Sequence, residues 1–459
     1  MPLVSINPTT GQTIHRFIEH SRQEVDRVLE RAHRSFLAWR ELAVTDRARF
    51  LRNTATILKA ERNALAALIT SEMGKPITQA RAEIEKCAAA CLYYAKHGAK
   101  FLKTEHPPEA PRGTKVVYEP LGPVLAIMPW NFPFWQTFRA AVPALLGGNT
   151  IVLKHSSNTC GCGLAIEEVF KRAGLPAGVF QTLLVGSAAV PRLIASEQIA
   201  AVTLTGSTAA GKEVAELAGA ALKPCVLELG GSDPYLILGD ANLALAAEIC
   251  ATARLVNCGQ SCIAAKRFIV VESVRAAFED QLVSRIMAHR VGDPFLADTA
   301  VGPMARADLR DEIDRQVRQS VRQGACLLLG GNIPDGPGFF YEPTVLAHVS
   351  KGMPACDQEL FGPVAAIVPV VDEEAAITAA NDSRFGLGAA IFTRDIRRGE
   401  EIAHERLDAG MVFINDFVRS DVSLPFGGVK QSGFGRELSA HGMHEFLNIK
   451  TIWTSSAKR

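Results

Sequence analysis

Mainly apolar, strand-like runs alternate with helical stretches along the chain, and this alternation limits the possible folds more than any other feature. Residues 124–127, 150–154 and 201–204 are strand-like runs, and helical stretches at 163–173 and 209–218 follow the second and third. Strands buried on both faces of a parallel sheet have such runs, and parallel connections need a crossover of helical length. The sequence therefore predicts an α/β fold in which helices cover both faces of a mostly parallel sheet.

Segments on either side of this series extend the fold to more than one domain. The first hundred residues are predicted to be helical: Ser21 with Glu24 forms a helix-start signal, and residues 46–59 and 77–100 have apolar residues at helical spacing. A second series of strand-like runs follows at residues 268–271, 326–329, 364–368 and 389–392. A chain of 459 residues is too long for one compact core, so we expect two or three domains.

Composition and charge argue against several classes of partner. The net charge of +1 gives no support for nucleic acid or an anionic membrane as a partner. No apolar run reaches membrane-spanning length, and the first residues lack the basic and apolar regions of a signal peptide. The ten cysteines do not form a small disulfide scaffold in so long a chain, and the pairs Cys87/Cys91 and Cys160/Cys162 lack histidines at zinc-finger spacing. We therefore expect no bound metal and a cytoplasmic protein with reduced thiols.

Three short motifs supply a thiol, a carboxylate and a side-chain amide, the parts needed to oxidise an aldehyde through a thioester. Cys262 ends Gly-Gln-Ser-Cys, Glu228 stands in Leu-Glu-Leu-Gly-Gly, and Asn131 stands in Pro-Trp-Asn-Phe-Pro. Each has a simpler interpretation, as a small buried cysteine, a solvated strand-end carboxylate and a helix cap. Against these, Cys262 follows an interrupted helix-like stretch, where helix amides could lower its pKa. Leucines flank Glu228 and would raise its pKa toward that of a general base.

Together these motifs resemble those of the aldehyde dehydrogenase superfamily, over nearly the whole chain. Residues 154–156, 265–268 and 426–437 look like the bacterial succinate-semialdehyde dehydrogenase branch. The resemblance implies that the Cys262 thiolate adds to the aldehyde, while Asn131 and the Cys262 amide hold the oxyanion. Hydride then passes to an oxidised nicotinamide, and Glu228 activates the water that releases the acid.

The resemblance also implies how the chain is divided. A dinucleotide-binding domain would comprise residues 1–111 and 129–229, and a catalytic domain residues 230–440. Residues 112–128 and 441–459 would form a small β oligomerisation arm that pairs with another subunit of a homodimer or homotetramer. The sequence by itself shows the alternation of strands and helices, not the arm.

The expected cofactor site lacks the usual Gly-x-Gly-x-x-Gly motif. Its candidate is the glycine-rich turn from Thr205 to Gly211, where free helix amides suit a phosphate. The cofactor-binding residues implied by the resemblance are Trp130, Lys154, His155, Ser156, Ser157, Gly206, Ser207, Gly211, Leu229, Glu359 and Phe361. Ser157 replaces a glutamate of the commonest family motif that would repel a 2′-phosphate, and Lys154 and His155 add positive character. We therefore expect NADP to be preferred and NAD to be usable.

A carboxylated substrate is indicated by Arg139, about two helical turns from Asn131 if residues 133–140 are helical. It could instead form a surface salt bridge. In the resembling branch this arginine binds the distal carboxylate of succinic semialdehyde, as in 4-aminobutyrate degradation, with Ser420 as second ligand. Trp135 and Phe417 would form pocket walls.

Three other functions remain possible: a broad-specificity aldehyde dehydrogenase, a CoA-acylating relative and a non-catalytic structural or binding protein. Glu228 favours hydrolysis over transfer to CoA, because a CoA-dependent enzyme needs no base for water.

Cys258 stands where the usual motif has threonine, and its role has two interpretations. It is either a small buried residue or a partner that captures oxidised Cys262 as a reversible disulfide, which requires Cα atoms within about 7 Å.

Overall fold

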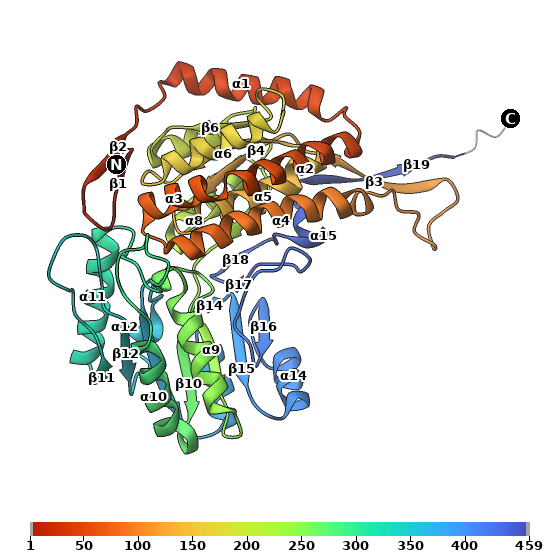
Figure 1. The fold of residues 1–459 in the computed structure, drawn as a ribbon. Helices are drawn as coiled ribbons and strands as arrows, with labels where there is room; N and C mark the ends of the chain where they lie inside the picture. The colour runs from red at the N-terminus through yellow and green to blue at the C-terminus, as the bar shows by residue number, and fades with distance from the viewer. Residues whose placement is uncertain (1–2, 456–459) are drawn as a thin grey trace.

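The computed structural model describes residues 3–455, which form two large sheets and a projecting arm (Figure 1). The first sheet contains, in spatial order, β18 (Gly433–Phe434), β8 (Cys225–Glu228), β7 (Ala201–Thr205), β4 (Pro123–Met128), β5 (Thr150–His155) and β6 (Phe180–Leu183). The second contains β11 (Cys326–Leu329), β12 (Thr344–Ala347), β13 (Val364–Val370), β10 (Ala265–Val271), β9 (Asp233–Ile237), β15 (Gly388–Phe392) and β16 (Met411–Ile414). All neighbouring strands are parallel except the edge strands β18 and β11. The predicted α/β fold is therefore confirmed.

Helices cover each sheet. Those packed with the first sheet are α1 (Arg22–Trp39), α2 (Val44–Ala60), α3 (Arg62–Met73), α4 (Ile77–Phe101), α5 (Pro133–Gly147), α6 (Cys160–Arg172), η1 (Ser187–Ala189), α7 (Val190–Ala195) and α8 (Thr208–Ala220). The second series is α9 (Leu243–Leu255), η2 (Val256–Gly259), α10 (Glu272–Met287), α11 (Ala307–Arg322), α12 (Pro354–Asp357), α13 (Glu373–Asn381) and α14 (Ile396–Glu405). Two small antiparallel two-stranded sheets, β1 (Val4–Ile6) with β2 (Thr13–Arg16) and β14 (Phe385–Gly386) with β17 (Val429–Lys430), complete the body.

The predicted start of α1 is a complete capping box. The Ser21 hydroxyl accepts the Glu24 backbone N–H at 3.3 Å, and the Glu24 carboxylate accepts the Ser21 N–H at 2.7 Å. This reciprocal pairing satisfies two backbone donors that a helix start otherwise leaves free. The predicted helices at 46–59 and 77–100 agree with α2 and α4 to within two residues at each end.

Both faces of the first sheet are buried, because successive side chains of β4 point into different cores. Val124 and Ala126 belong to a core shared with α4, α5 and α6. Leu125 and Ile127 belong to a second core shared with α1, α7 and α8. The continuous apolar runs of the sequence follow from this two-sided burial.

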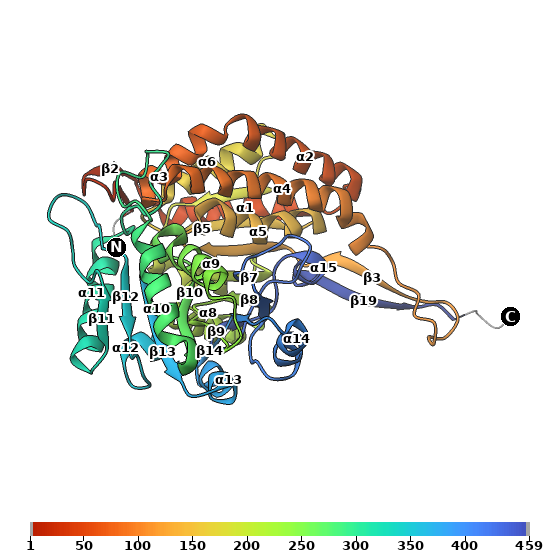
Figure 2. The same cartoon turned by 60° about the horizontal axis from the view of Figure 1, so that its bottom comes forward.

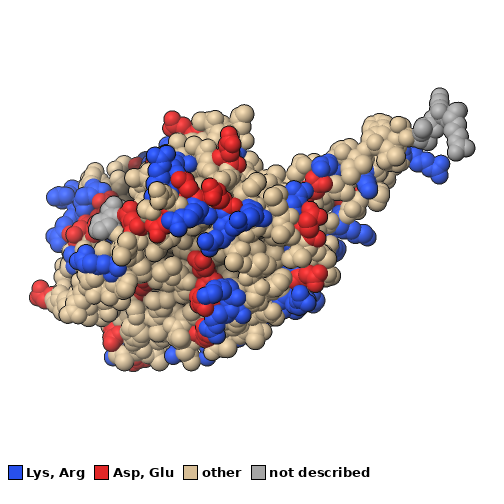
Figure 3. Space-filling model, turned by 90° about the horizontal axis from the view of Figure 1, so that it is seen from above, with Lys and Arg blue, Asp and Glu red and all other residues tan. Residues whose placement is uncertain are grey.

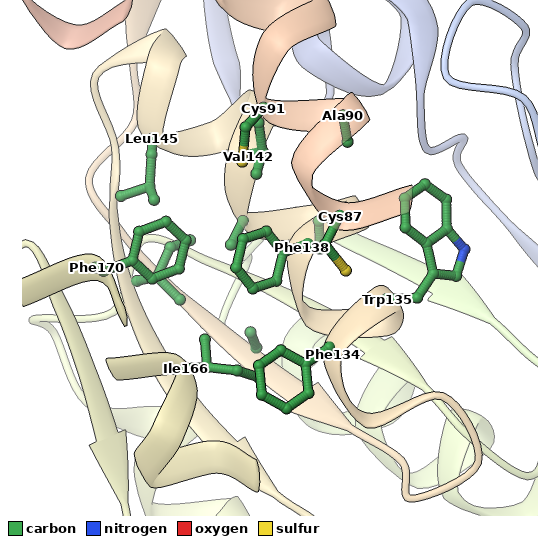
Figure 4. Close-up of a cluster of buried hydrophobic side chains, with 14 of the residues drawn as sticks. Cys87, Ala90, Cys91, Phe134, Trp135, Phe138, Val142, Leu145, Ile166 and Phe170 are labelled. Atoms are coloured by element: carbon green, nitrogen blue, oxygen red, sulfur yellow. The ribbon is translucent and has the colours of Figure 1, made fainter. Parts of the chain in front are cut away.

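Buried thiols form part of the first of these cores. Figure 4 shows Cys87 and Cys91 of α4 against Phe138 and Val142 of α5, with Trp135 at the edge of the cluster. All ten cysteines lie within residues 3–455, and each is free. This agrees with the prediction of reduced thiols.

The arm consists of β3 (Thr114–Pro120) and β19 (Leu447–Trp453), which pair antiparallel and project from the body in Figures 1 and 2. The predicted arm segment 112–128 was too long, because the structure places β4 in the middle of the first sheet, between β7 and β5. Strand propensity does not say which sheet a run joins. Residues 456–459 of the predicted arm, and residues 1–2 of the predicted first domain, lie outside the described residues.

The C-terminal part of the predicted catalytic domain also returns to the first sheet. β18 pairs with β8, although residues up to 440 were assigned to the catalytic domain. α15 (Ser439–His444) packs against α5 and α4 instead of belonging to the arm.

The space-filling view shows lysine and arginine interspersed with aspartate and glutamate along the body and the arm (Figure 3). Within residues 3–455, no helix has the length and apolar character needed to cross a bilayer.

The strand order of the first sheet reverses at β4, and this reversal determines where a ligand can bind. From β4 the chain proceeds outward through β5 to β6 and then returns to the other side of β4 for β7 and β8. In doubly wound sheets, a crevice opens at the carboxyl ends of the strands where the order reverses. The segments that follow β4 and β7, residues 129–131 and 206–207, therefore meet at this crevice.

Candidate active site

Cys262 lies on the turn before β10 and lines two neighbouring cavities. The first, about 720 Å³, opens at the strand reversal, and we call it the switch-point cavity. Its walls include Trp130, Asn131, Gly206, Ser207, Leu229, Glu359 and Phe361. The second, about 770 Å³, lies beside α4 and α5, and we call it the α4–α5 cavity. Its walls include Lys86, Phe132, Trp135, Arg139, Ser420 and Phe426.

A strained turn holds Cys262 between these cavities. Asn257, Cys258 and Gly259 have φ angles of 55°, 56° and 70°, a run of three left-handed residues. Such a conformation costs about 1–2 kcal/mol at each residue other than glycine, so other contacts must stabilise it. The Asn257 side-chain amide donates to the backbone oxygens of Asn131 at 2.7 Å and Gln260 at 3.0 Å. The turn that leads to Cys262 is thereby attached to the segment that carries Asn131.

Asn131 has an N–H available for a ligand. Its side-chain amide donates one hydrogen bond, at 3.1 Å, to the backbone oxygen of Gln260, and its side chain is 4% exposed. A primary amide carries two N–H groups, so a second donor is left where Asn131 lines the switch-point cavity. The geometry therefore fits the predicted oxyanion donor, and the alternative of a helix cap fails because no side-chain cap of α5 is present.

Two ion pairs support this arrangement, and of their four residues the sequence indicated only Glu359 as part of the site. Lys266 Nζ donates to the backbone oxygens of Ser261 at 2.9 Å and Cys262 at 2.7 Å and lies 3.6 Å from Glu359. Glu83 accepts the N–H groups of Phe134 at 2.9 Å and Trp135 at 3.0 Å and pairs with buried Lys75. The first pair fixes the carbonyls around the thiol, and the second fixes the start of α5.

The expected low pKa of Cys262 is not found. No helix begins at Cys262, since it lies on a turn before β10. Burial raises the pKa of the Cys262 thiol to about 12, and the nearby positive charges of Arg139 and Lys266 only partly oppose this. The residue is therefore a neutral thiol near pH 7 in this conformation, and it must lose a proton before it can act as a nucleophile.

Glu228 lies at the end of β8, fully buried, so the alternative of a solvated carboxylate is wrong. Burial raises the pKa of its carboxyl well above the usual range, as predicted, although the charge of Arg139 opposes the rise. Neither carboxyl oxygen has a hydrogen-bond partner among the described residues. The side chain lines neither cavity and lies against Gly427, next to the Arg139–Glu437 pair.

The structure separates the predicted cofactor residues into groups. Six line the switch-point cavity: Trp130, Gly206, Ser207, Leu229, Glu359 and Phe361. Ser157 instead lines a separate surface pocket with Arg306. Gly211 lies in α8 beneath Leu229, where a Cβ atom would collide with the leucine side chain, so it serves close packing.

His155 does not supply the positive character expected of it. Its Nε2 lies 3.0 Å from the backbone oxygen of Pro133, and its Nδ1 accepts the Ser156 N–H at 2.9 Å. Burial lowers the pKa of His155 to about 4. The imidazole is therefore neutral at physiological pH, and Lys154 is the remaining cation of this segment.

The switch-point cavity fits a nucleotide cofactor. Ser207 caps α8 by accepting the Ala210 N–H at 3.3 Å, and the first amides of a helix have no acceptor within it. These amides and the helix dipole suit a pyrophosphate. Trp130 and Phe361 stand edge to face with ring centres 5.7 Å apart, and Glu359 accepts the Gly231 N–H at 3.0 Å. The cavity thus combines a phosphate-binding helix start, aromatic walls and a carboxylate for ribose hydroxyls.

Three of the four predicted substrate residues line the α4–α5 cavity: Arg139, Trp135 and Ser420. Arg139 is 2% exposed, pairs with buried Glu437 and lies 4.3 Å from the ring centre of Phe426, so the alternative of a surface salt bridge is wrong. Phe417 packs instead against the core of the second sheet. Phe132 and Phe426 provide aromatic walls that the sequence did not single out.

Cys258 points away from the cavities. Its Sγ lies 3.9 Å from Met304 Sδ, and the residue is 1% exposed within the core of the second sheet. Burial raises the pKa of its thiol to about 12. This environment favours the interpretation of Cys258 as a small buried residue.

Comparison with known proteins agrees with this geometry. The model of the aldehyde dehydrogenase family matches residues 2–452. The chain is 49% identical to succinate semialdehyde dehydrogenase [NAD(P)+] Sad of Escherichia coli, over 98% of this chain and 97% of the relative. It is 47% identical to a probable succinate-semialdehyde dehydrogenase [NADP(+)] of Synechocystis, over 99% and 100%. The crystal structure of succinic semialdehyde dehydrogenase from Streptococcus pyogenes with NADP+ superposes with a TM-score of 0.96 at 37% identity, covering 98% and 99% of the two chains.

Proposed function

The chain belongs to the aldehyde dehydrogenase family, and we propose that it oxidises succinic semialdehyde to succinate with NADP as the preferred cofactor and NAD as a usable one. The observation that carries the proposal is the position of Cys262 between two cavities. One cavity has the features of a nucleotide site, and the other is lined by the cations Lys86 and Arg139. A nucleophile in that position can meet a carboxylated aldehyde from one side and a nicotinamide from the other. The named activities of the relatives support the same substrate and cofactor.

Within this proposal, each residue has a defined chemical task. Cys262, once deprotonated, adds to the aldehyde carbon and forms a thiohemiacetal. The free N–H of the Asn131 amide and the backbone N–H of Cys262 hold the resulting oxyanion, and one such donor is worth about 3–4 kcal/mol. The bound nicotinamide supplies the acceptor for the hydride that the substrate loses. Trp130, Ser207, Glu359 and Phe361 would hold and orient it.

Glu228 completes the reaction as the base for hydrolysis. Its raised pKa suits proton transfer near neutral pH. From its place beside Gly427, the side chain must rotate toward Cys262 before it can take a proton from water. The water then attacks the Cys262 thioester, and succinate and the thiol are released.

The arm and the thiols suggest the assembly and the compartment. β3 and β19 form a two-stranded ribbon with free edges, and Ile449 and Trp453 on β19 are 60% and 64% exposed. Exposed apolar side chains on a strand edge favour pairing with another subunit. We therefore propose a homodimer or homotetramer joined through the arm. Ten free thiols favour a reducing, cytoplasmic environment.

A steady-state panel tests the proposal. Succinic, malonic and glutaric semialdehydes and uncharged butanal are each assayed with NADP and NAD, following the absorbance of the reduced nicotinamide. We expect the highest kcat/KM with succinic semialdehyde and NADP. Equal values for butanal would indicate a broad-specificity enzyme, and acyl-CoA formation on adding CoA would indicate an acylating relative. Absence of cofactor reduction with every aldehyde would indicate a non-catalytic protein.

A further inference from the structure

Lys266 is a buried cation whose ammonium is directed at the backbone of the turn that carries Cys262. It lies at the start of β10, and its side chain has no exposed surface. Its Nζ donates to the backbone oxygens of Ser261 at 2.9 Å, Cys262 at 2.7 Å and Ala264 at 3.4 Å. An ammonium has three protons, so these three carbonyls occupy all of its donors.

A structural ion pair with Glu359 is the simpler interpretation of this lysine. The distance from Lys266 Nζ to Glu359 Oε1 is 3.6 Å, longer than the distances to the Ser261 and Cys262 carbonyls. The Glu359 carboxylate accepts the Gly231 N–H at 3.0 Å and lines the switch-point cavity. The ammonium is therefore directed mainly at the carbonyls, and the carboxylate serves as its counter-charge.

One of these carbonyls belongs to the same peptide unit as the N–H of the nucleophile. The Ser261 oxygen and the Cys262 N–H point in opposite directions, because the peptide bond between them is planar and trans. A cation that holds the Ser261 oxygen therefore also sets the direction of the Cys262 N–H. Among the described residues, that N–H has no hydrogen-bond acceptor, so it is available to an aldehyde oxygen.

The charge of Lys266 also makes this N–H a stronger donor. Hydrogen bonds at the two ends of one peptide group polarise each other, and a charged donor polarises the group more than a neutral one. The effect is greatest where water is excluded, as it is around the buried Lys266 side chain. Negative charge that develops on the aldehyde oxygen would therefore be stabilised through the peptide by the ammonium behind it.

We propose that Lys266 is a positioning residue of the oxyanion hole, which fixes the Ser261–Cys262 peptide with its N–H toward the aldehyde oxygen and strengthens that N–H as a donor. The inference rests on the proposed function, since it takes Cys262 as the nucleophile toward an aldehyde. Lys266 lines neither cavity, so its effect passes through the peptide and not through contact with a ligand.

The test must separate this effect from a simpler one on the thiol. Burial raises the pKa of the Cys262 thiol, and the charges of Arg139 and then Lys266 oppose the rise. Removing Lys266 should therefore slow every reaction of the thiolate. Alkylation of Cys262 by iodoacetamide needs the thiolate but forms no oxyanion, whereas addition to an aldehyde needs both.

Lys266→Met removes the ammonium and keeps an unbranched side chain. Both measurements are made with saturating NADP: the rate of alkylation of Cys262, and kcat/KM for succinic semialdehyde. Outright loss of an oxyanion donor lowers kcat about 10²- to 10³-fold, and a displaced donor should cost less. We therefore expect kcat/KM to fall about 10- to 100-fold more than the alkylation rate.

Arg254→Met is the matched control. Arg254 is a buried cation that donates to the Gly259 carbonyl of the same turn at 2.6 Å, but not to the peptide that carries the Cys262 N–H. Its losses in the two assays should be equal. Thermal unfolding and fluorescence titration with NADP report whether each variant folds. If Lys266→Met does not fold, Lys266→Gln takes its place, because its amide keeps an uncharged donor, and its losses should be smaller but still unequal.

Three results would overturn the inference. Equal losses in the two assays would assign Lys266 to the thiol pKa alone, and a loss confined to NADP affinity would assign it to the ion pair with Glu359. Unequal losses of the same size in Arg254→Met would show that a loosened turn is sufficient. If the wild type reduces no cofactor with any aldehyde, the proposed function itself fails, and the inference fails with it.

Discussion

Replacing Glu228 by glutamine tests the chemistry and the energetics of the buried carboxyl together. Both carboxyl oxygens are buried without a partner among the described residues, and burial raises the pKa of Glu228 well above its usual range. Burial also raises the pKa of nearby Glu437, although its ion pair with Arg139 opposes the rise. Glu228 has no such partner among the described residues, and its pKa is raised well above the usual range.

The sign of the stability effect follows from the proton of the Glu228 carboxyl. Above a pH of about 4.3 the unfolded chain releases it, so each further pH unit costs the native state about 1.4 kcal/mol while Glu228 stays protonated. Glutamine has a similar shape and no charge to lose. Glu228→Gln should therefore be more stable than the wild type at pH 8, by about 1.4 kcal/mol for each unit by which burial raises the pKa of Glu228 above about 4.3, up to pH 8. The gain should vanish near pH 4, where both states of the wild type hold the proton.

Guanidinium unfolding of both proteins at pH 4, 6 and 8 measures this difference through the transition midpoints. A stability difference that does not change with pH would refute the argument that Glu228 releases a proton on unfolding. In the functional assay, the same variant should give one equivalent of reduced cofactor per active subunit, followed by turnover about 10²- to 10⁴-fold slower than in the wild type. A variant without the initial burst would place Glu228 before thioester formation.

Three further substitutions test individual residues. Cys262→Ala should abolish turnover and leave NADP binding, measured by fluorescence, largely intact; turnover near the wild-type rate would exclude Cys262 as nucleophile. Ser157→Glu should shift the kcat/KM ratio toward NAD, because it restores a carboxylate where the family motif has one, and an unchanged ratio would contradict the account of this segment. Cys258→Thr should lose activity in peroxide and regain it in dithiothreitol as the wild type does, because Cys258 Sγ lies against Met304. Recovery in the wild type alone would show that Cys258 captures the oxidised nucleophile.

Local sequence signals predicted those parts of the fold that depend on neighbouring residues. The capping box of Ser21 and Glu24 lies within one helical turn, and the runs that became β4 and β5 needed only their own apolar residues to be recognised. The arm boundary failed because β3 and β4 are both strand-like, and only tertiary contacts separate them. The chemistry-bearing motifs of Cys262 and Asn131 could be located because each stands in an unusual short motif.

The sequence could not show which charged and polar side chains contact each other in the folded chain. Lys86 and Ser420 are 334 residues apart and contact each other only because α4 and the loop after β16 line one cavity. A half-buried lysine at helical spacing looks like a solvated residue until its neighbours are known. For the same reason Arg139 was recognised as a cation near the nucleophile, but its partner Glu437 was not.

The corrections at Cys262 and His155 have one cause, and it leads to a last prediction. Both pKa values depend on how much water the tertiary structure removes, which no short motif encodes. With a pKa of about 4, His155 carries no charge between pH 6 and 8 and so adds no positive charge to a preference for NADP.

The ratio of kcat/KM for NADP to that for NAD should therefore not fall as pH rises from 6 to 8. A histidine with an ordinary pKa of about 6.5 would lose its charge in this range and weaken the preference. Ionisation of the 2′-phosphate, with a second pKa of about 6, would instead strengthen the preference for NADP as pH rises. A measured fall would consequently mean that a protonated His155 holds the phosphate, and Ser157→Glu, assayed alongside, shows whether the pH effect requires that phosphate site.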